Sequence, residues 1–137
     1  MLTCEEIKPG IIAYFGHQKL NSDERIAKPT SLVPRDGPYI CFAIAGRDSG
    51  WTALTTQNKE MRLFLRFDWR EGGMGQWTTD PMSLASGGNT YVGPNEAFVE
   101  AAFGVDKADS KTRGKLNAEG MAQVVSEVRL QKGRFPS

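Results

Sequence analysis

Cysteine and histidine are scarce in this sequence, which leaves little material for a disulfide framework or a metal centre. The chain has two cysteines, Cys4 and Cys41, which lie far apart and form no CxxC pair, and one histidine, His17. Secreted domains that depend on disulfides carry more cysteines, and zinc sites draw mainly on cysteine and histidine. We therefore expect two free thiols, with Cys41 buried in an apolar strand, and neither a metal nor another cofactor. A catalytic thiol is the alternative.

Long hydrophobic runs and an excess of one charge are also absent. No apolar stretch approaches the roughly 20 residues that span a bilayer, and the acidic segment 1–6 lacks the features of a signal peptide. These observations predict a cytoplasmic protein with no membrane contact. Lys plus Arg is 17 and Asp plus Glu is 16. The net charge of +1 argues against DNA binding through a global positive field, but it leaves room for a local basic groove.

Length and glycine content favour one turn-rich domain. The 137 residues match a common domain size, so we expect a single domain over 1–137. Glycine, at 15 residues, exceeds its usual share of about 7% and favours β structure with many turns. Apolar runs and breaker residues predict strands at 11–15, 39–45 and 51–57, a turn at 46–50 and a long polar loop at 16–38.

The clearest strand pattern lies between Met61 and Trp69, after a hairpin turn at 58–60. Alternation predicts two faces. One face would carry Met61, Leu63, Leu65, Phe67 and Trp69, and the other Arg62, Phe64, Arg66 and Asp68.

Residues 70–94 predict turns around one or two short strands, the later one near 90–92. The segment 95–103 fits either a strand or a helix that is capped by Asn95 and ended by Gly104, and local signals slightly favour the helix.

A helix is predicted at the C-terminal end of the chain. Asn117 is a capping residue, and Glu119 stands in the first turn, where the helix dipole favours an acid. An apolar stripe that would pack on the sheet is formed by Met121, Val124, Val125 and Val128. The predicted fold class is mainly β (α+β): a small bent antiparallel sheet or an SH3-like barrel with a C-terminal helix.

Basic and aromatic side chains share one face of the predicted 61–69 strand, at Arg62, Phe64 and Arg66. Aromatic rings on a sheet stack bases while arginines hold phosphates. The alternative is that Phe64 packs under a loop or at a subunit contact and that the arginines are solvated. Basic residues also gather at 107–115 and at Arg129, Lys132 and Arg134, where solvated surface is the simpler interpretation.

Two glycine-rich segments carry weaker signals. The segment 47–50 resembles the nucleophile segment of some serine hydrolases, but Ser49 lacks the glycine two residues before it, and His17 would have to complete a triad. The segment 72–75 lacks the pattern of a phosphate-binding loop. Plain turns are the favoured interpretation of both.

Four short motifs occur in an order that carries a resemblance. They are Lys8-Pro9-Gly10-Ile11-Ile12, Gly37-Pro38 before an apolar strand, Leu54-Thr55-Thr56-Gln57-Asn58-Lys59 before Met61–Phe67, and Gly114-Lys115-Leu116-Asn117-Ala118-Glu119 before the last helix. In this order the chain resembles the MazF/PemK/Kid family of toxin endoribonucleases over most of its length.

This resemblance implies a fold, partners and a chemistry. The family has an SH3-like barrel with a terminal helix, usually forms homodimers, and has an RNA groove that an antitoxin peptide covers. Its members cleave single-stranded RNA without a metal and leave a 2′,3′-cyclic phosphate. The 2′-hydroxyl must lose a proton, charge at phosphorus must be stabilised, and the 5′-oxygen must be protonated.

The resemblance also implies site residues. Thr55 matches the catalytic threonine of the family. The family's arginine stands directly before the proline, where this chain has Gly37, so Arg35 is the candidate catalytic arginine and Arg47 is another substitute. The candidate RNA-binding residues are Thr56, Gln57, Arg62, Phe64 and Arg66. An inactive relative is the second form of this hypothesis.

Two function classes remain as alternatives. A small β-barrel binding module without catalytic activity would hold a peptide or small ligand, with Trp51, Trp69 and Trp77 as an apolar wall. A structural homodimer without a ligand is the third possibility.

Overall fold

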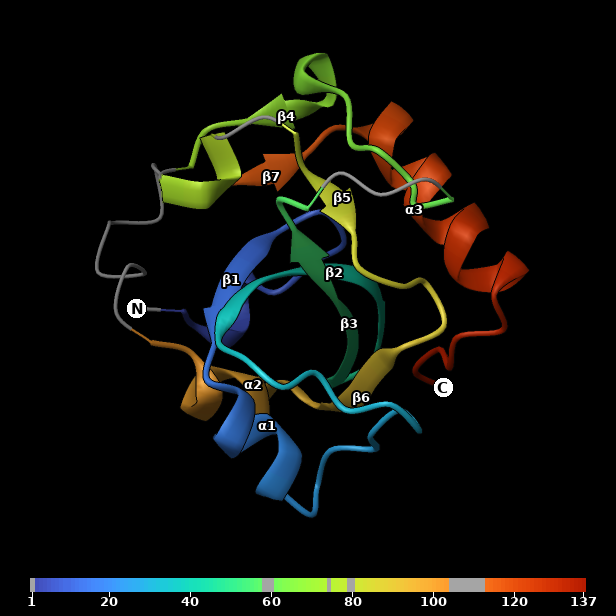
Figure 1. Cartoon of the computed structure of the whole chain (residues 1–137). Coiled ribbons are helices and arrows are strands. Elements are labelled where there is room, and N and C mark those ends of the chain that lie inside the picture. The colour runs from blue at the N-terminus through green and yellow to red at the C-terminus, as the bar shows by residue number, and fades with distance from the viewer. Residues whose placement is uncertain (1, 58–60, 74, 79–80, 104–112) are drawn as a thin grey trace.

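The computed structural model describes residues 2–57, 61–73, 75–78, 81–103 and 113–137. Over these residues the protein is an α+β structure, with an antiparallel sheet and helices that include a C-terminal one (Figure 1). The strands are β1 (Ile12–Phe15), β2 (Gly37–Ala45), β3 (Asp48–Thr55), β4 (Arg70–Glu71), β5 (Ser83–Leu84), β6 (Thr90–Pro94) and β7 (Lys115–Leu116). The helices are α1 (His17–Ser22), α2 (Asn95–Ala101) and α3 (Ala118–Leu130), with 3₁₀ turns at Cys4–Glu6, Phe67–Trp69 and Gly75–Thr78.

The hairpin of β2 and β3 is the centre of the sheet. Gly46, at a φ of +61°, forms its turn with Arg47, and Asp48 already pairs with Ala45. One edge of β2 pairs with β1, while the far edge of β3 pairs with β6 over Asp48–Thr52 and with β5 over Leu54–Thr55. The predicted bent antiparallel sheet is therefore confirmed. Within the described residues it stays open, so the barrel form of the prediction is not adopted.

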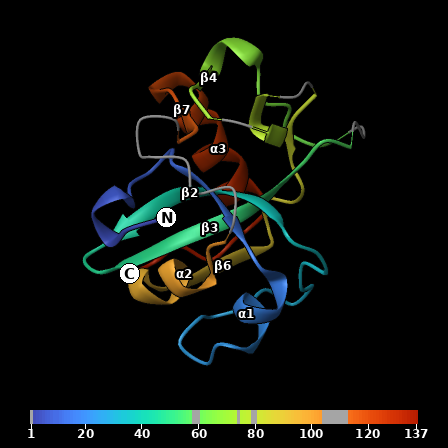
Figure 2. The ribbon, with the colours of Figure 1, turned by 90° about the vertical axis from the view of Figure 1, so that its left-hand side faces the viewer.

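Apolar clusters lie on both faces of this hairpin, because neighbouring strand residues point to opposite faces. Tyr39, Cys41 and Trp51 pack on one face with Phe98 of α2. Ile40, Phe42 and Leu54 pack on the other face with Val124 and Val128 of α3. Figure 2 shows α2 and α3 on opposite sides of β2 and β3. Cys41 is buried in an apolar strand and both cysteines are free, as predicted.

A second, two-stranded sheet lies next to the N-terminal segment. β4 pairs with β7, and the residues around β7 also bind the N-terminal segment. The amide of Leu116 donates to the carbonyl of Gly10 at 2.8 Å, and the amide of Ile12 donates to the carbonyl of Gly114 at 2.9 Å. Residues 10–12 are thus held by residues 114–116.

The predicted 61–69 strand is wrong. Only Phe64 forms a bridge, to Ser83, and the chain then enters the Phe67–Trp69 turn. Met61 is 94% exposed and Phe67 is 60% exposed, whereas Leu65 and Trp69 are buried, so these apolar residues share no single face. The strand-like alternation holds only around the bridge. Beyond it, the Arg66 side chain binds Asp68, and the Arg66 carbonyl accepts the amide hydrogen of Trp69. Both contacts favour a turn. The expected hairpin turn at 58–60 lies outside the described residues.

The helix predictions are confirmed with two corrections. Asn117 caps α3 by accepting the amide hydrogen of Gly120 at 2.9 Å. The helical alternative for 95–103 is the right one, but Pro94 precedes α2 and Asn95 is its first residue rather than a side-chain cap. Gly104 lies outside the described residues. The predicted loop at 16–38 contains the short helix α1, whose Leu20 is buried.

The neighbours of Gly120 in α3 leave no room for a side chain. Alanine would gain about 1 kcal/mol of helix propensity. Its Cβ would however lie 2.7 Å from Leu116 Cγ and 3.0 Å from Trp69 Cβ. We expect Gly120→Ala to lower the free energy of unfolding by about 1–2 kcal/mol, measured by urea denaturation. Ser126→Ala, on the exposed side of α3, is the control and should be neutral or slightly stabilising. A Gly120→Ala protein as stable as the parent would contradict the packing argument.

Candidate functional site

A cavity of about 510 Å³ opens where β2 begins and β3 ends. Antiparallel pairing brings these two ends together, because Tyr39 of β2 lies opposite Ala53 of β3. The lining residues are 32–39, 53–57, 85–86, Arg62 and Asn89. Its size suits a small ligand or a nucleotide unit.

Arg35 and Thr55 meet in this cavity. Nη2 of Arg35 donates to Oγ1 of Thr55 at 3.4 Å, a long hydrogen bond that joins an exposed arginine to a hydroxyl on a residue only 4% exposed. Oγ1 also accepts the amide hydrogen of Gln57 at 3.1 Å. With two donors already on its oxygen, the Thr55 hydroxyl keeps its own hydrogen for an acceptor on a ligand.

Arg35 stands at a bend just before β2, and the space beside the first residue of β2 is open. A Cβ at Gly37 would meet nothing within 4 Å, which means that the space over the start of β2 is open. Arg35 reaches Thr55 across this end of the sheet.

Two anchors fix the backbone on either side of Arg35. The amide of Val33 donates to the Tyr91 hydroxyl at 2.9 Å, and that hydroxyl donates to Asn21 Oδ1 at 2.7 Å. Asp36 accepts the His17 amide at 2.9 Å, and its Oδ1 lies 2.7 Å from His17 Nδ1. The hydrogen bond from the His17 backbone, followed by that from its ring, lowers the pKa of Asp36. These contacts restrict where the Arg35 side chain begins.

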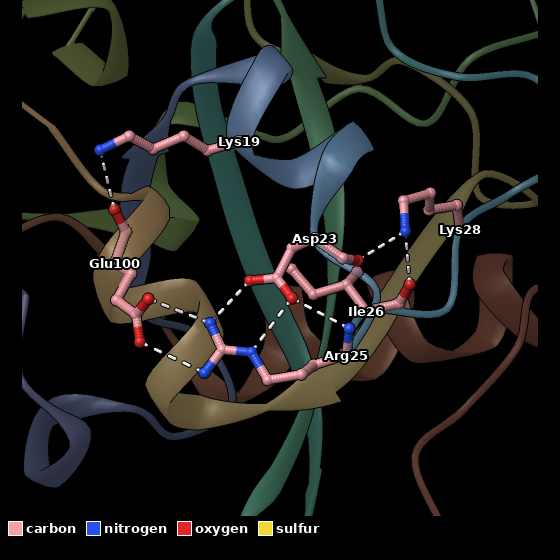
Figure 3. A network of polar contacts seen from close by, with 6 residues as sticks. All are labelled: Lys19, Asp23, Arg25, Ile26, Lys28 and Glu100. Atoms are coloured by element: carbon pink, nitrogen blue, oxygen red, sulfur yellow. Dashed lines mark hydrogen bonds and ion pairs between the residues drawn. The ribbon is translucent and has the colours of Figure 1, made fainter.

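The first part of the same loop is tied to α2 (Figure 3). Arg25 binds Asp23 in its own loop and, at 3.0 and 3.2 Å, both carboxylate oxygens of Glu100 on α2. The side-chain hydrogen bonds from Arg25 lower the pKa of Asp23. Lys28 Nζ donates to the carbonyls of Asp23 and Ile26. This charged network closes the turn between α1 and the segment that carries Arg35.

The predicted RNA-binding residues separate into three groups. Thr56, Gln57 and Arg62 line the cavity with Arg35 and Thr55.

Phe64 is not a lining residue of the cavity. It bridges Ser83, which also pairs with Thr55, so these three residues form one row across the sheet. Two strand spacings place Phe64 about 10 Å from Thr55 on the same face. Arg66 stands apart, because it pairs with Asp68 and lies over the Trp69 ring.

Two cavity residues, Tyr39 and Asp36, were missed from the sequence, while the predicted Arg62 shows an unexpected feature. Tyr39 is 1% exposed, and its hydroxyl has no hydrogen-bond partner within the described part of the chain. Nη1 of Arg62 is buried and equally lacks a described partner, although the rest of that side chain is partly exposed. Asp36 also lines the cavity. Tyr39 belongs to an apolar run, which gave no sign that its hydroxyl stands alone, and nothing in the sequence links Asp36 to His17.

Other candidate groups have structural roles. Ser49 is fully buried and accepts a hydrogen bond from the Trp51 indole, far along β3 from Thr55, so it is no exposed nucleophile. Burial raises the pKa of Cys41 to about 12, which leaves a neutral thiol at physiological pH. No group of metal-ligating side chains occurs among the described residues.

The three tryptophans of the binding-module alternative do not form an apolar wall at the surface. Trp51, Trp69 and Trp77 are all buried in the two core clusters. In the predicted basic run at 107–115, residues 107–112 lie outside the described structure. Arg113 is buried against Glu6, so it does not belong to an open basic surface.

Comparisons of the chain with protein-family models, with curated proteins and with solved structures gave no significant match. None of the helices in the described residues has the length and apolar character needed to cross a membrane.

Proposed function

We propose that this protein is a metal-independent endoribonuclease that cleaves single-stranded RNA in the cytoplasm. The observation that carries the proposal is the 3.4 Å contact between Arg35 Nη2 and Thr55 Oγ1 inside one cavity. Thr55 was selected from the sequence as the match to the family's catalytic threonine, and Arg35 as a substitute two residues before the family's arginine position. The two residues are 20 positions apart in the chain.

The proposed reaction uses the 2′-hydroxyl of the substrate as the nucleophile. The 2′-oxygen forms a bond to the neighbouring phosphorus and gives its proton to solvent. The bond from phosphorus to the 5′-oxygen breaks, and that oxygen takes up a proton. The products are a 2′,3′-cyclic phosphate and a 5′-hydroxyl end.

The two side chains serve this reaction through charge and hydrogen bonding. The guanidinium of Arg35 stabilises the negative charge that grows on the phosphate oxygens, because its planar fork matches them. The Thr55 hydroxyl donates its hydrogen to one of the same oxygens. Long hydrogen bonds in a site without substrate commonly shorten when the substrate binds. Gln57, whose amide holds Thr55, keeps the hydroxyl oriented.

The proposal predicts cleavage in the absence of divalent metal. Purified protein incubated with a mixed single-stranded RNA and EDTA should give fragments with cyclic phosphate and 5′-hydroxyl ends. Thr55→Val keeps the side-chain shape and removes the hydroxyl, so it should slow cleavage by about 10- to 100-fold. A substrate with a single 2′-deoxyribose at a cleavage site should resist cleavage there, because it lacks the nucleophile.

The Thr55→Val protein, purified in parallel, also controls for contaminating nucleases. Equal cleavage by the parent and Thr55→Val, or fragments with 3′-hydroxyl ends, would reject the proposal. The homodimer and the antitoxin peptide that the resemblance implies are further predictions, to be tested by molecular mass in solution and by inhibition of this assay.

A further inference from the structure

Two donors at the cavity stand without acceptors. The hydroxyl of Tyr39 and Nη1 of Arg62 are both buried, and neither has a hydrogen-bond partner among the described residues. Both residues line the cavity that contains Arg35 and Thr55. Tyr39 belongs to β2, whereas Arg62 enters from the segment next to β5, so two separate parts of the chain bring donors to the same space.

Such atoms are uncommon because they cost free energy. Most buried polar groups in proteins find a partner, and an unpaired charged group is more costly than an unpaired neutral one. Burial raises the pKa of Tyr39 far above neutrality, so its phenol keeps its hydrogen. An arginine is always charged and has no acceptor atom. The missing counterpart must therefore supply acceptors, and negative charge suits it best.

The carboxylate of Asp36, which also lines the cavity, does not fill this role. Its Oδ1 is bound to the amide and the ring of His17. Arg35 is already engaged with Thr55. Arg62 is thus the cavity cation that no described acceptor satisfies at Nη1.

We propose that Arg62 and the Tyr39 hydroxyl form a second phosphate subsite, which binds a phosphate next to the one held by Arg35 and Thr55. This inference rests on the proposed function and narrows its substrate to RNA with at least two consecutive phosphates. The cavity volume of about 510 Å³ accommodates more than one phosphate group.

The test uses uncleavable probes. The parent probe is uridylyl-uridine with a 2′-deoxyribose at the first position. Two further probes add a terminal phosphate to it, one at the 5′ end and one at the 3′ end. The fourth probe is uridine 3′-monophosphate. Affinity is measured by calorimetry at low salt. One of the two phosphorylated dinucleotides should bind at least tenfold more tightly than the unphosphorylated one, and the mononucleotide should bind weakly.

Substitutions then test which residues cause the tighter binding of the phosphorylated dinucleotide. Arg62→Gln should abolish the tenfold gain, and Tyr39→Phe should reduce it about threefold to tenfold. Tyr39→Phe should also raise the midpoint of thermal unfolding, since it removes a buried hydroxyl without a partner and keeps the ring. Arg47→Gln, in the exposed turn at the other end of the hairpin, removes the same charge and should leave the gain intact.

The inference is overturned if neither terminal phosphate improves binding, if the gain survives Arg62→Gln, or if Tyr39→Phe leaves the gain unchanged. Uridine 3′-monophosphate binding as tightly as the best dinucleotide would assign the subsite to free phosphate monoesters and reject the RNA assignment. The probes cannot be cleaved, so the two proposals fail separately. A phosphate gain without RNA cleavage rejects the nuclease, and cleavage without the gain rejects the subsite.

Discussion

Replacing Arg35 with glutamine should lower the rate of RNA cleavage by roughly 100- to 1000-fold, the usual loss when one preorganised donor to transition-state charge is removed. The loss should fall mainly on kcat, because the guanidinium acts on charge that develops during the reaction. Arg35 is exposed, so the free energy of unfolding should change little. Single-turnover cleavage of a labelled RNA, together with urea denaturation, measures both quantities.

Two further variants sharpen this result. Arg35→Lys keeps the charge but loses the planar fork, and it should recover only part of the rate. Arg47→Gln makes the same change in charge outside the cavity, and it should keep nearly full activity. An Arg35→Gln protein within about threefold of the parent would remove Arg35 from the mechanism, and a large loss in Arg47→Gln would move the role to that residue.

The ion pair between Glu6 and Arg113 should make the largest single contribution to stability among the charged contacts of the described residues. Arg113 Nε lies 2.7 Å from Glu6 Oε2, and the side chains are only 3% and 15% exposed, respectively. Glu6→Gln takes the carboxylate away from a buried guanidinium, so we expect the free energy of unfolding to fall by about 3 kcal/mol. Glu5→Gln is the matched control, since Glu5 lies in the same 3₁₀ turn but is exposed.

The same pair predicts a dependence on pH. Burial alone would raise the pKa of Glu6, but the hydrogen bond and charge of Arg113, together with two hydrogen bonds from Thr3, hold this pKa below its ordinary value of 4.5. The unfolded chain therefore binds a proton more readily, and the stabilisation is complete above pH 4.5 and declines as the pH falls below that value. The difference in stability between the parent and Glu6→Gln should shrink over the same range. Equal stability of Glu5→Gln and Glu6→Gln at pH 7 would contradict the argument.

The hairpin was predictable because its signals are local. A continuous apolar run at 39–45, a glycine at 46 and a run of strand formers from Trp51 are sufficient to specify two buried neighbouring strands. The alternation of 61–69 failed because the path of this segment depends on distant partners. Trp69 is buried beside residues of α3 and β7, and that burial together with the Arg66–Asp68 turn overrides the local period.

In the candidate site, too, some features follow from local sequence and others depend on residues distant in the chain. Thr55 was found from a motif, whereas Arg35 was named only as an arginine two residues before the position where the family has its own. Phe64 was placed on a strand that does not form, yet its single bridge to Ser83 still aligns it with Thr55. Tyr39 was taken as part of an apolar strand. Whether its hydroxyl has a partner depends on the three-dimensional surroundings, which no pattern of residue types along the chain reports.

The pairing of residues 10–12 with residues 114–116 has a consequence for folding during translation. A ribosome releases the N-terminal residues first. The backbone groups of Gly10 and Ile12 therefore have no Leu116 or Gly114 to bind until those residues have been synthesised. Glu6 waits in the same way for Arg113. Arg35 and Thr55 lie within the first half of the chain and emerge long before these late partners. This part of the fold therefore closes only after residue 116 has been synthesised, when β7 returns to residues 10–12.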